Sequence, residues 1–321
     1  MVPMQFIAGL LLAKSWPGTS NAAKDSGCRL AMQRSDDQAA ISVAVIIPTY
    51  NRCGVLSRAL DSVRAQTSQP AEVCVVDDGS TDGTARLLVD QYPEIQVLHQ
   101  ENLGVSAARN LGVKHTSAPW LAFLDSDDEW LPEKLARQMA EIESSPDTRL
   151  VHSDEIWIRN GRRINPMLKH RKSGGDIFSQ SLRMCAISPS AAVMQRKLFE
   201  EVGGFDESLP ACEDYDLWLR VCSRYPVNYV DMPLLKKYGG HADQLSRKHW
   251  GMDRFRIRSL AGLLDSGVLD RRTGKAAEAV QVLQEKCRIL MLGASKRSNN
   301  AVLAECQAIL MRLGVEDAGQ A

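Results

Sequence analysis

The sequence predicts an α/β fold in which a mostly parallel sheet is flanked by helices and followed by a helical C-terminal tail. Short apolar runs alternate with segments of helical periodicity between residues 42 and 124, which is the pattern of successive βαβ units. Each apolar run ends in a polar turn, as buried parallel strands do at their carboxyl edge. Beyond residue 246 only amphipathic helical periodicity remains, which predicts the tail.

The first expected strand covers residues 42–48 and closes at Pro48, which cannot donate to a sheet ladder. Leu56, Leu60 and Val63 then repeat at helical spacing. Three further strands are expected at 73–76, 95–98 and 120–124, with helices near 85–92 and 105–111 between them. Because the carboxyl ends of parallel strands share one edge, four polar turns should meet there: 49–52, 77–82, 101–104 and 125–129.

The remainder of the chain shows a more mixed pattern. A helix is expected after Pro132, strands at 151–154 and 156–158, and a hairpin turn at Asn160–Gly161. A short helix at 197–202 and a helix beginning near Glu213 follow, and two amphipathic helices lie in the tail. We therefore divide the chain into a leader (1–40), an α/β domain (41–245) and a helical C-terminal extension (246–321), which packs on the domain, forms a small cap or serves a partner.

Composition narrows the class of protein. Of the 321 residues, 44% are hydrophobic and 24% are charged, as in ordinary globular proteins. Lys plus Arg equals Asp plus Glu at 39 each, so the global charge gives no reason to expect nucleic-acid binding. The eight cysteines form no Cys-x-x-Cys pair, which argues against a zinc knuckle or redox motif and favours a reducing cytoplasm.

The N-terminal residues predict a flexible leader or an over-extended start. The apolar run Phe6–Ala13 is too short to span a bilayer. A secretory signal has basic residues before its apolar core, whereas Lys14 follows this run. We therefore expect a cytoplasmic protein whose membrane contact is at most peripheral, at the inner face.

The acidic turn after the fourth strand predicts a metal site. Asp125 and Asp127 are two residues apart, and Asp128 adjoins them. Carboxylates this close repel unless a cation lies among them. A Mg²⁺ or Mn²⁺ ion that shares its ligands with phosphate oxygens would satisfy them. The alternative is a solvated acidic turn before a helix.

Other polar turns carry groups suited to a nucleotide. Tyr50 could stack on a base, Asp77 or Asp78 could accept hydrogen bonds from base or ribose, and Arg109 could face a phosphate. Each has a structural alternative: Tyr50 could only pack, and Arg109 could pair with a neighbouring carboxylate. The expected convergence of these turns on one rim favours the nucleotide interpretation.

Two later groups are further candidates. Asp214 lies at the expected start of a helix, where a carboxylate is stabilised in its charged form, so it could act as a base. His241 follows two glycines and could return to the rim as a metal ligand. The basic run 159–172 is either a solvated hairpin or a loop that touches a diphosphate or an anionic acceptor.

Five motifs in order resemble a known family. They are Ser42-Val-Ala-Val-Ile-Ile-Pro-Thr-Tyr-Asn-Arg52, Val75-Val-Asp-Asp-Gly-Ser-Thr-Asp82, Asn102-Leu-Gly104 with Ala108-Arg-Asn110, Phe123-Leu-Asp-Ser-Asp-Asp128, and Glu213-Asp214. Together they resemble the inverting, bacterial-type family 2 glycosyltransferases of the GT-A fold. The resemblance covers roughly residues 42–245 and specifies the family but not the substrate.

The resemblance implies metal-dependent transfer from a nucleotide-diphospho-sugar to a glycan or lipid-linked acceptor. Pro48, Thr49 and Tyr50 would line the base pocket, and Asp77 or Asp78 would contact base or ribose. Asp125 would face the ribose and the metal's water, Asp127 would bind the Mn²⁺ or Mg²⁺, and His241 could complete its shell. Asp214 would be the general base, with Glu213 beside it, and the extra carboxylate of Asp128 leaves the ligand set open.

A non-catalytic module that binds sugar nucleotides or glycans on the same fold is the alternative function. The intact Asp125, Asp127 and Asp214 argue against it. The acceptor, the sugar and the base are not specified by these motifs. We expect acceptor specificity within residues 155–212.

Overall fold

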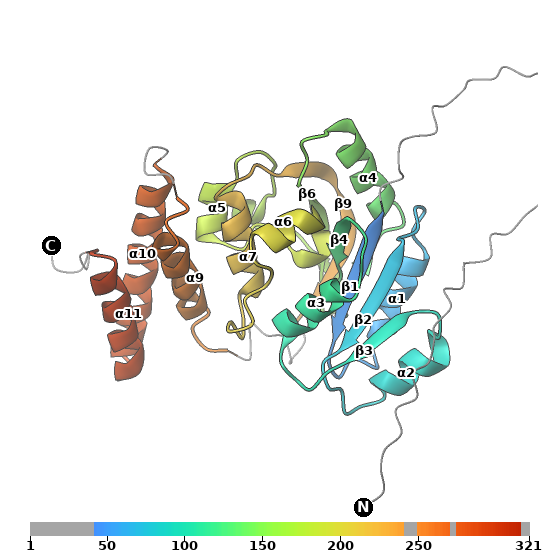
Figure 1. Cartoon of the computed structure of the whole chain (residues 1–321). Helices are drawn as coiled ribbons and strands as arrows, with labels where there is room; N and C mark the ends of the chain where they lie inside the picture. The colour runs from blue at the N-terminus through green and yellow to red at the C-terminus, as the bar shows by residue number, and fades with distance from the viewer. Residues whose placement is uncertain (1–41, 241–248, 270–273, 316–321) are drawn as a thin grey trace, which may run out of the picture. The chain divides into compact units, whose positions relative to one another are not determined.

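The computed structural model describes residues 42–240, 249–269 and 274–315, and these described residues belong to one compact unit. Four parallel strands form one half of its sheet (Figure 1). Their order is β3 (Gln96–His99), β2 (Glu72–Asp77), β1 (Val43–Thr49) and β4 (Trp120–Phe123). In register, Thr49 lies beside Asp77, and Asp77 lies beside His99. The turns that follow these strands therefore meet at one edge, as predicted.

The side chains of β1 alternate between two faces of the sheet. Val43, Val45 and Ile47 pack with helices α1 (Leu56–Arg64) and α4 (Lys134–Ser144). Ala44 and Ile46 face the opposite core, where α3 (Val105–Lys114) covers β1 and β2. A Cβ atom at Gly112 would lie 2.6 Å from Ile46 Cγ2, so this glycine allows the close approach of α3.

The other half of the sheet is mixed. β8 (Val193–Gln195) is antiparallel to β4 and to β6 (Leu150–Arg159). β6 pairs in parallel with β9 (Asn228–Gly239), and β9 pairs with the short β5 (Glu129–Trp130). The predicted hairpin is present: β7 (Arg162–Ile164) returns along β6. The two strands expected at 151–154 and 156–158 are one strand, irregular in register where Asp154 pairs with Pro233 of β9.

Shorter helices cover the rest of the domain. The remaining elements of this region are α2 (Thr84–Gln91), η1 (Leu168–His170), α5 (Phe178–Arg183), η2 (Pro189–Ala191), α6 (Arg196–Glu201) and α7 (Glu213–Cys222). Helix α7 begins at Glu213, as predicted, and packs with α5. Neither α5 nor β9 was predicted from the sequence.

The C-terminal helices share the domain's core. α9 (Asp253–Asp265) packs against α7, and α10 (Lys275–Ser295) packs against both α9 and α5. The last helix, α11 (Asn300–Arg312), packs on α10 (Figure 1). Their buried side chains, such as Leu260 and Leu283, belong to the same cluster as Trp218 of α7. The described helices of the tail thus pack on the domain.

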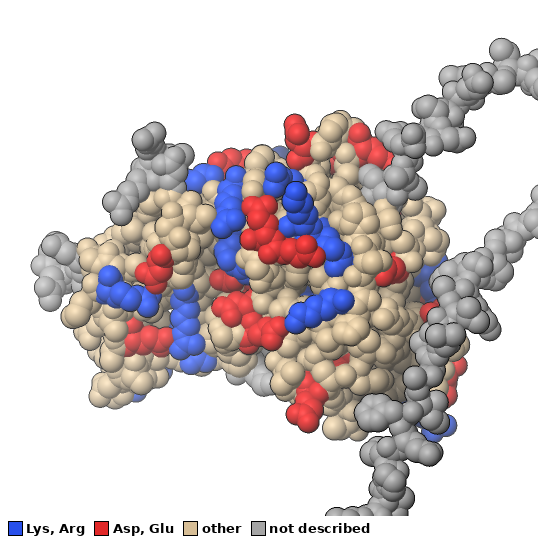
Figure 2. Space-filling view, viewed as in Figure 1, with Lys and Arg blue, Asp and Glu red and all other residues tan. Residues whose placement is uncertain are grey.

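The described surface carries both signs of charge. On the face shown in Figure 2, Lys and Arg side chains are interleaved with Asp and Glu side chains across the middle of the molecule. This mixture agrees with the balance of 39 basic and 39 acidic residues. None of the helices in the described ranges has the length and apolarity needed to cross a membrane.

Candidate active site

The turns after β1 and β2 are locked together. Asn51 adopts a left-handed conformation (φ 52°), and its Oδ1 accepts a hydrogen bond of 2.8 Å from the backbone N–H of Thr81. The N–H of Asn51 donates to Ser80 Oγ at 2.9 Å. Arg52 N–H likewise donates to Thr84 Oγ1 at 3.0 Å. These bonds fix the predicted base pocket to the neighbouring turn.

The predicted base pocket offers one free polar atom and one exposed ring. Thr49 is 2% exposed, and its Oγ1 has no hydrogen-bond partner in the structure. Pro48 is buried beside it, whereas Tyr50 is 42% exposed and is available to pack against a ligand. Buried hydroxyl groups are normally paired, so Thr49 Oγ1 is a polar atom at the predicted base pocket that the protein's own groups leave unsatisfied.

Asp77 and Asp78 lie at the rim but face into the protein, 2% and 5% exposed. Asp77 Oδ1 accepts from Ser80 N–H at 2.9 Å. The Asp78 carboxylate accepts from Gln100 Nε2 (2.6 Å) and from the N–H groups of Leu103 and Gly104, each at 2.9 Å. Both residues therefore shape the loops around the pocket, and direct contact with base or ribose stays a prediction.

The three aspartates of the acidic turn after β4 differ in burial. Asp125 and Asp127 are half-buried, whereas Asp128 is 2% exposed. The two oxygens of Asp128 accept from Ser190 Oγ at 2.7 Å and from Tyr238 N–H at 3.1 Å. Burial, together with the charge of Asp125, raises the pKa of Asp128 well above its usual range. Asp128 thus holds the turn in place, which leaves Asp125 and Asp127 as the candidate ligands.

Arg109 joins the acidic turn to the start of α7. Its Nη2 donates to Asp125 Oδ1 at 2.7 Å, and its Nη1 donates to Glu213 Oε1 at 2.8 Å. The Arg109 side chain is 3% exposed and that of Glu213 is 7% exposed. The alternative in which Arg109 pairs with carboxylates is therefore the one found, and a phosphate contact gains no support. Glu213 is likewise buried and binds Arg109, and its role beside Asp214 stays a prediction.

This bridge predicts a large stability effect. Arg109→Met would leave Glu213 buried without a counter-charge, and breaking a buried ion pair in this way costs about 3–5 kcal/mol. We expect that loss in the free energy of unfolding measured by urea denaturation. Arg86→Met is the control, because it removes only an exposed pair with Asp90 (3.2 Å) and should leave the midpoint unchanged. Equal midpoints for the two variants would contradict the bridge.

Asp214 is half-buried at the start of α7, next to Glu213. Its Oδ2 lies 3.1 Å from Cys185 Sγ, and its Oδ1 accepts from the N–H of Tyr215 at 2.7 Å. Because Glu213 binds Arg109, and Arg109 binds Asp125, Asp214 and the acidic turn belong to the same site. The second predicted metal group, His241, lies outside the described residues.

Lys237 belongs to this site and was not predicted from the sequence. Its Nζ donates to Ser188 Oγ at 2.9 Å. Burial lowers the pKa of Lys237, but the charges of Glu155, Asp128, Asp125 and Asp214 outweigh that effect and raise it above its usual value. In the sequence, only the apolar segment that precedes Lys237 could have indicated strand β9. Pro233 argues against a strand there, because proline cannot donate to a sheet ladder.

The residues present fit a metal ion bound mainly by a substrate. Among the described residues, no group of three or more His, Cys, Asp or Glu side chains could hold a metal ion by itself. Mg²⁺ is commonly held by one or two carboxylates together with water and substrate phosphates. The two half-buried carboxylates of Asp125 and Asp127 match that donor set.

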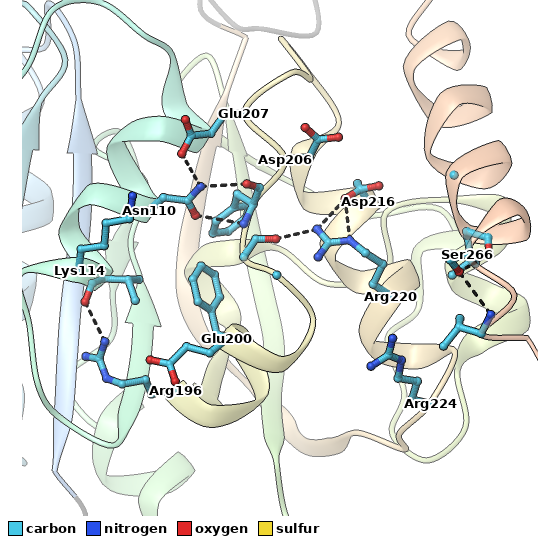
Figure 3. Close-up of a pocket in the computed structure, with 18 of the residues that line it drawn as sticks. Asn110, Lys114, Arg196, Glu200, Asp206, Glu207, Asp216, Arg220, Arg224 and Ser266 are labelled. Carbon is cyan, nitrogen blue, oxygen red and sulfur yellow. Dashed lines mark hydrogen bonds and ion pairs between the residues drawn. The ribbon is translucent and has the colours of Figure 1, made fainter.

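A cavity of about 1020 Å³ lies elsewhere and contains none of the predicted site residues. It is bordered by α3, α6, α7 and α9 (Figure 3). Three of its cations are already engaged: Arg220 pairs with Asp216 at 2.6 Å, Arg224 pairs with Glu201 at 3.4 Å, and Arg196 donates to Val113 O at 2.8 Å. Chemistry in this protein is therefore expected at the strand edge and not in this cavity.

Comparison with known proteins identifies the family. Residues 44–203 match the model of glycosyl transferase family 2. An uncharacterized glycosyltransferase of Rickettsia felis is 31% identical over 213 residues, which are 64% of this chain and 35% of that protein. Uncharacterized glycosyltransferase YwdF of Bacillus subtilis is 28% identical over 257 residues, covering 74% of this chain and 94% of YwdF. Chondroitin synthase of Escherichia coli is 27% identical over a region that covers 59% of this chain and 28% of the synthase.

Solved structures support the same fold. TarS 1–349 of S. aureus in complex with UDP-GlcNAc superimposes with a TM-score of 0.62 at 20% identity, over 76% of this chain and 71% of that one. The UDP complex of TarS 1–349 gives 0.58 at 22% identity, over 76% and 70%. The chain belongs to the family 2 glycosyltransferases and has the GT-A fold, which confirms the predicted family and fold class. It spans about a third of the length of the first curated relatives it matches.

Proposed function

We propose that this protein is an inverting glycosyltransferase that moves a sugar from a nucleotide-diphospho-sugar to a hydroxyl group of an acceptor. One observation carries the proposal: Arg109 binds both Asp125 and Glu213. It thereby links the acidic turn 125–129, which we expect to bind the donor and call the donor turn, to the predicted base Asp214 at the start of α7. Family membership supports the reaction class. The UDP-GlcNAc and UDP complexes of TarS support a UDP-sugar as the donor.

On the donor side, the chain's own groups bind and orient the nucleotide. Tyr50 provides an exposed ring for the base, and Thr49 Oγ1 provides a buried polar atom that has no partner. Asp127 and Asp125 would hold Mn²⁺ or Mg²⁺ together with the diphosphate. When bound, such an ion stabilises the negative charge that develops on the leaving diphosphate.

On the acceptor side, Asp214 accepts the proton of the attacking hydroxyl, which is a weak nucleophile while protonated. The new bond forms between that oxygen and the anomeric carbon as the bond from this carbon to the diphosphate oxygen breaks. Attack from the face opposite the leaving group inverts the anomeric configuration. No covalent sugar–enzyme intermediate is required, because the base serves the acceptor directly.

The acceptor is proposed to be a glycan or a lipid-linked sugar in polysaccharide biosynthesis. The similarity to chondroitin synthase, over part of both chains, supports a glycan. We expect residues 155–212 to select the acceptor. This segment includes Cys185, which lies beside Asp214. It also includes three exposed hairpin residues, Arg159, Arg162 and Arg163. These cations suit an anionic acceptor or a peripheral contact with an anionic membrane surface.

A screen of nucleotide-diphospho-sugars with the purified full chain tests the proposal. We expect at least one donor to release nucleotide diphosphate when Mn²⁺ or Mg²⁺ is present, and the release to stop with EDTA. A suitable acceptor should increase the rate. A non-catalytic binding module would bind the same nucleotides in a calorimetric titration yet release no diphosphate with any donor, and that result would overturn the proposal.

A further inference from the structure

One segment, Cys185–Ser190, contacts both halves of the candidate site. At its end, Ser190 is fully buried. Its Oγ donates to Asp128 Oδ2 at 2.7 Å and accepts from Asp125 N–H at 3.1 Å. The carbonyl of Ser190 also accepts from Trp130 Nε1 at 2.8 Å. The segment is thereby anchored by two hydrogen bonds to the acidic turn and by one to Trp130 of β5.

The middle of the segment holds a cation beside the carboxylates. Ser188 is 6% exposed, and its Oγ accepts the hydrogen bond from Lys237 Nζ at 2.9 Å. The backbone N–H of the next residue in β9, Tyr238, donates to Asp128 Oδ1 at 3.1 Å. Strand β9, the acidic turn and this segment are therefore held together in one arrangement.

The start of the segment reaches the predicted base. Cys185 Sγ lies 3.1 Å from Asp214 Oδ2 and 3.2 Å from Ile187 O. Burial and the adjacent charge of Asp214 raise the pKa of the Cys185 thiol well above its usual value. The thiol is therefore protonated and donates a hydrogen bond. It is not a nucleophile, since only a thiolate attacks.

We propose that Cys185 is a positioning residue: its thiol orients the Asp214 carboxylate toward the acceptor, from a segment that Ser190 fixes to the donor turn. This inference rests on the proposed function and adds a residue to it. Asp214 follows Cys212, a non-glycine residue in the left-handed conformation (φ 63°) that gives α7 no side-chain cap. Within α7, the N–H of Tyr215 donates to Asp214 Oδ1, and Cys185 supplies the hydrogen bond to Oδ2 from another element.

Three variants of the full chain test this role in a steady-state transfer assay. Cys185→Ala should lower kcat by about tenfold, the size expected for loss of one hydrogen bond to a charged group, while donor KM and nucleotide affinity stay unchanged. Cys185→Ser should restore most of kcat, because a hydroxyl group donates the same bond. Cys222→Ala is the control, since it removes a buried thiol from α7 itself and should leave kcat per folded molecule unchanged.

The outcomes separate this inference from the proposed function. If Asp214→Asn is inactive but Cys185→Ala matches the wild type in kcat, the positioning role is wrong and the proposed function stands. If Cys185→Ser is as impaired as Cys185→Ala, the hydrogen bond is likewise not the cause. If the wild type releases no diphosphate, or Asp214→Asn keeps full activity, both proposals fail together. Should Cys185→Ala not fold, Cys185→Val, which fills the space without a donor, takes its place.

Discussion

Asp214→Asn lowers sugar transfer by about 10³-fold, within the range of 10² to 10⁴ that a general base contributes. Asparagine keeps the shape of the side chain, and its one amide oxygen can still accept from Tyr215 N–H, so α7 should begin at the same place. Its NH2 group replaces the oxygen that accepts from Cys185. Asparagine cannot take up the acceptor's proton, however. The donor turn is untouched, and nucleotide affinity should therefore equal that of the wild type. The measurement is single-turnover transfer at saturating donor, beside a calorimetric titration with UDP and Mn²⁺.

Asp216→Asn is the matched control for this experiment. Asp216 lies two residues further along α7 and pairs with Arg220 at 2.6 Å, away from the rim. Its loss should reduce stability but not the turnover of folded molecules. Wild-type transfer by Asp214→Asn, or an equal loss of transfer in Asp216→Asn, would show that Asp214 is not the base.

The strand pattern was predictable in the first half of the chain because β1 and β4 are buried on both faces along their whole length. Val43, Val45 and Ile47 face one core while Ala44 and Ile46 face the other, so the apolar run is continuous and its polar end is easy to see. β9 shows no such run. It is half-buried along most of its length and contains Pro233, which sits opposite the register irregularity in β6. Its pattern therefore resembles a loop.

The sequence identified the residues of the rim but could not assign their roles. Asp78, Asp125, Asp128 and Asp214 all follow apolar segments or begin a helix, and by residue type they are equivalent. Burial separates them: Asp78 and Asp128 face inward and bind loop donors, whereas Asp125 and Asp214 are half-buried. Which way a carboxylate turns depends on donors from distant segments, such as Ser190 and the N–H of Tyr238. The spacing of the aspartates within the acidic turn therefore could not predict which carboxylate faces inward.

Asp127→Ala abolishes the metal-dependent part of nucleotide binding and leaves the fold intact. Asp128 already supplies the buried hydrogen bonds that hold the turn, and Asp125 is held by Arg109. Removing the Asp127 carboxylate therefore leaves those hydrogen bonds in place, while it takes away one of the two acidic groups that match an Mg²⁺ or Mn²⁺ site. We expect UDP to bind the variant with the same Kd in Mn²⁺ as in EDTA. In the wild type, Mn²⁺ should tighten binding by at least about tenfold, or ~1.4 kcal/mol.

Asp147→Ala is the control, since Asp147 is exposed and follows α4, and it should retain the full effect of Mn²⁺. Thermal midpoints of both variants should match the wild type, which separates a lost ligand from a lost fold. Asp125→Ala provides a second comparison, because it also removes one hydrogen-bond partner of Arg109. This variant should lower the thermal midpoint as well as the affinity for UDP in Mn²⁺. If the Asp127→Ala variant still binds UDP more tightly in Mn²⁺ than in EDTA, the ion binds elsewhere, and the assignment of Asp127 as a metal ligand is wrong.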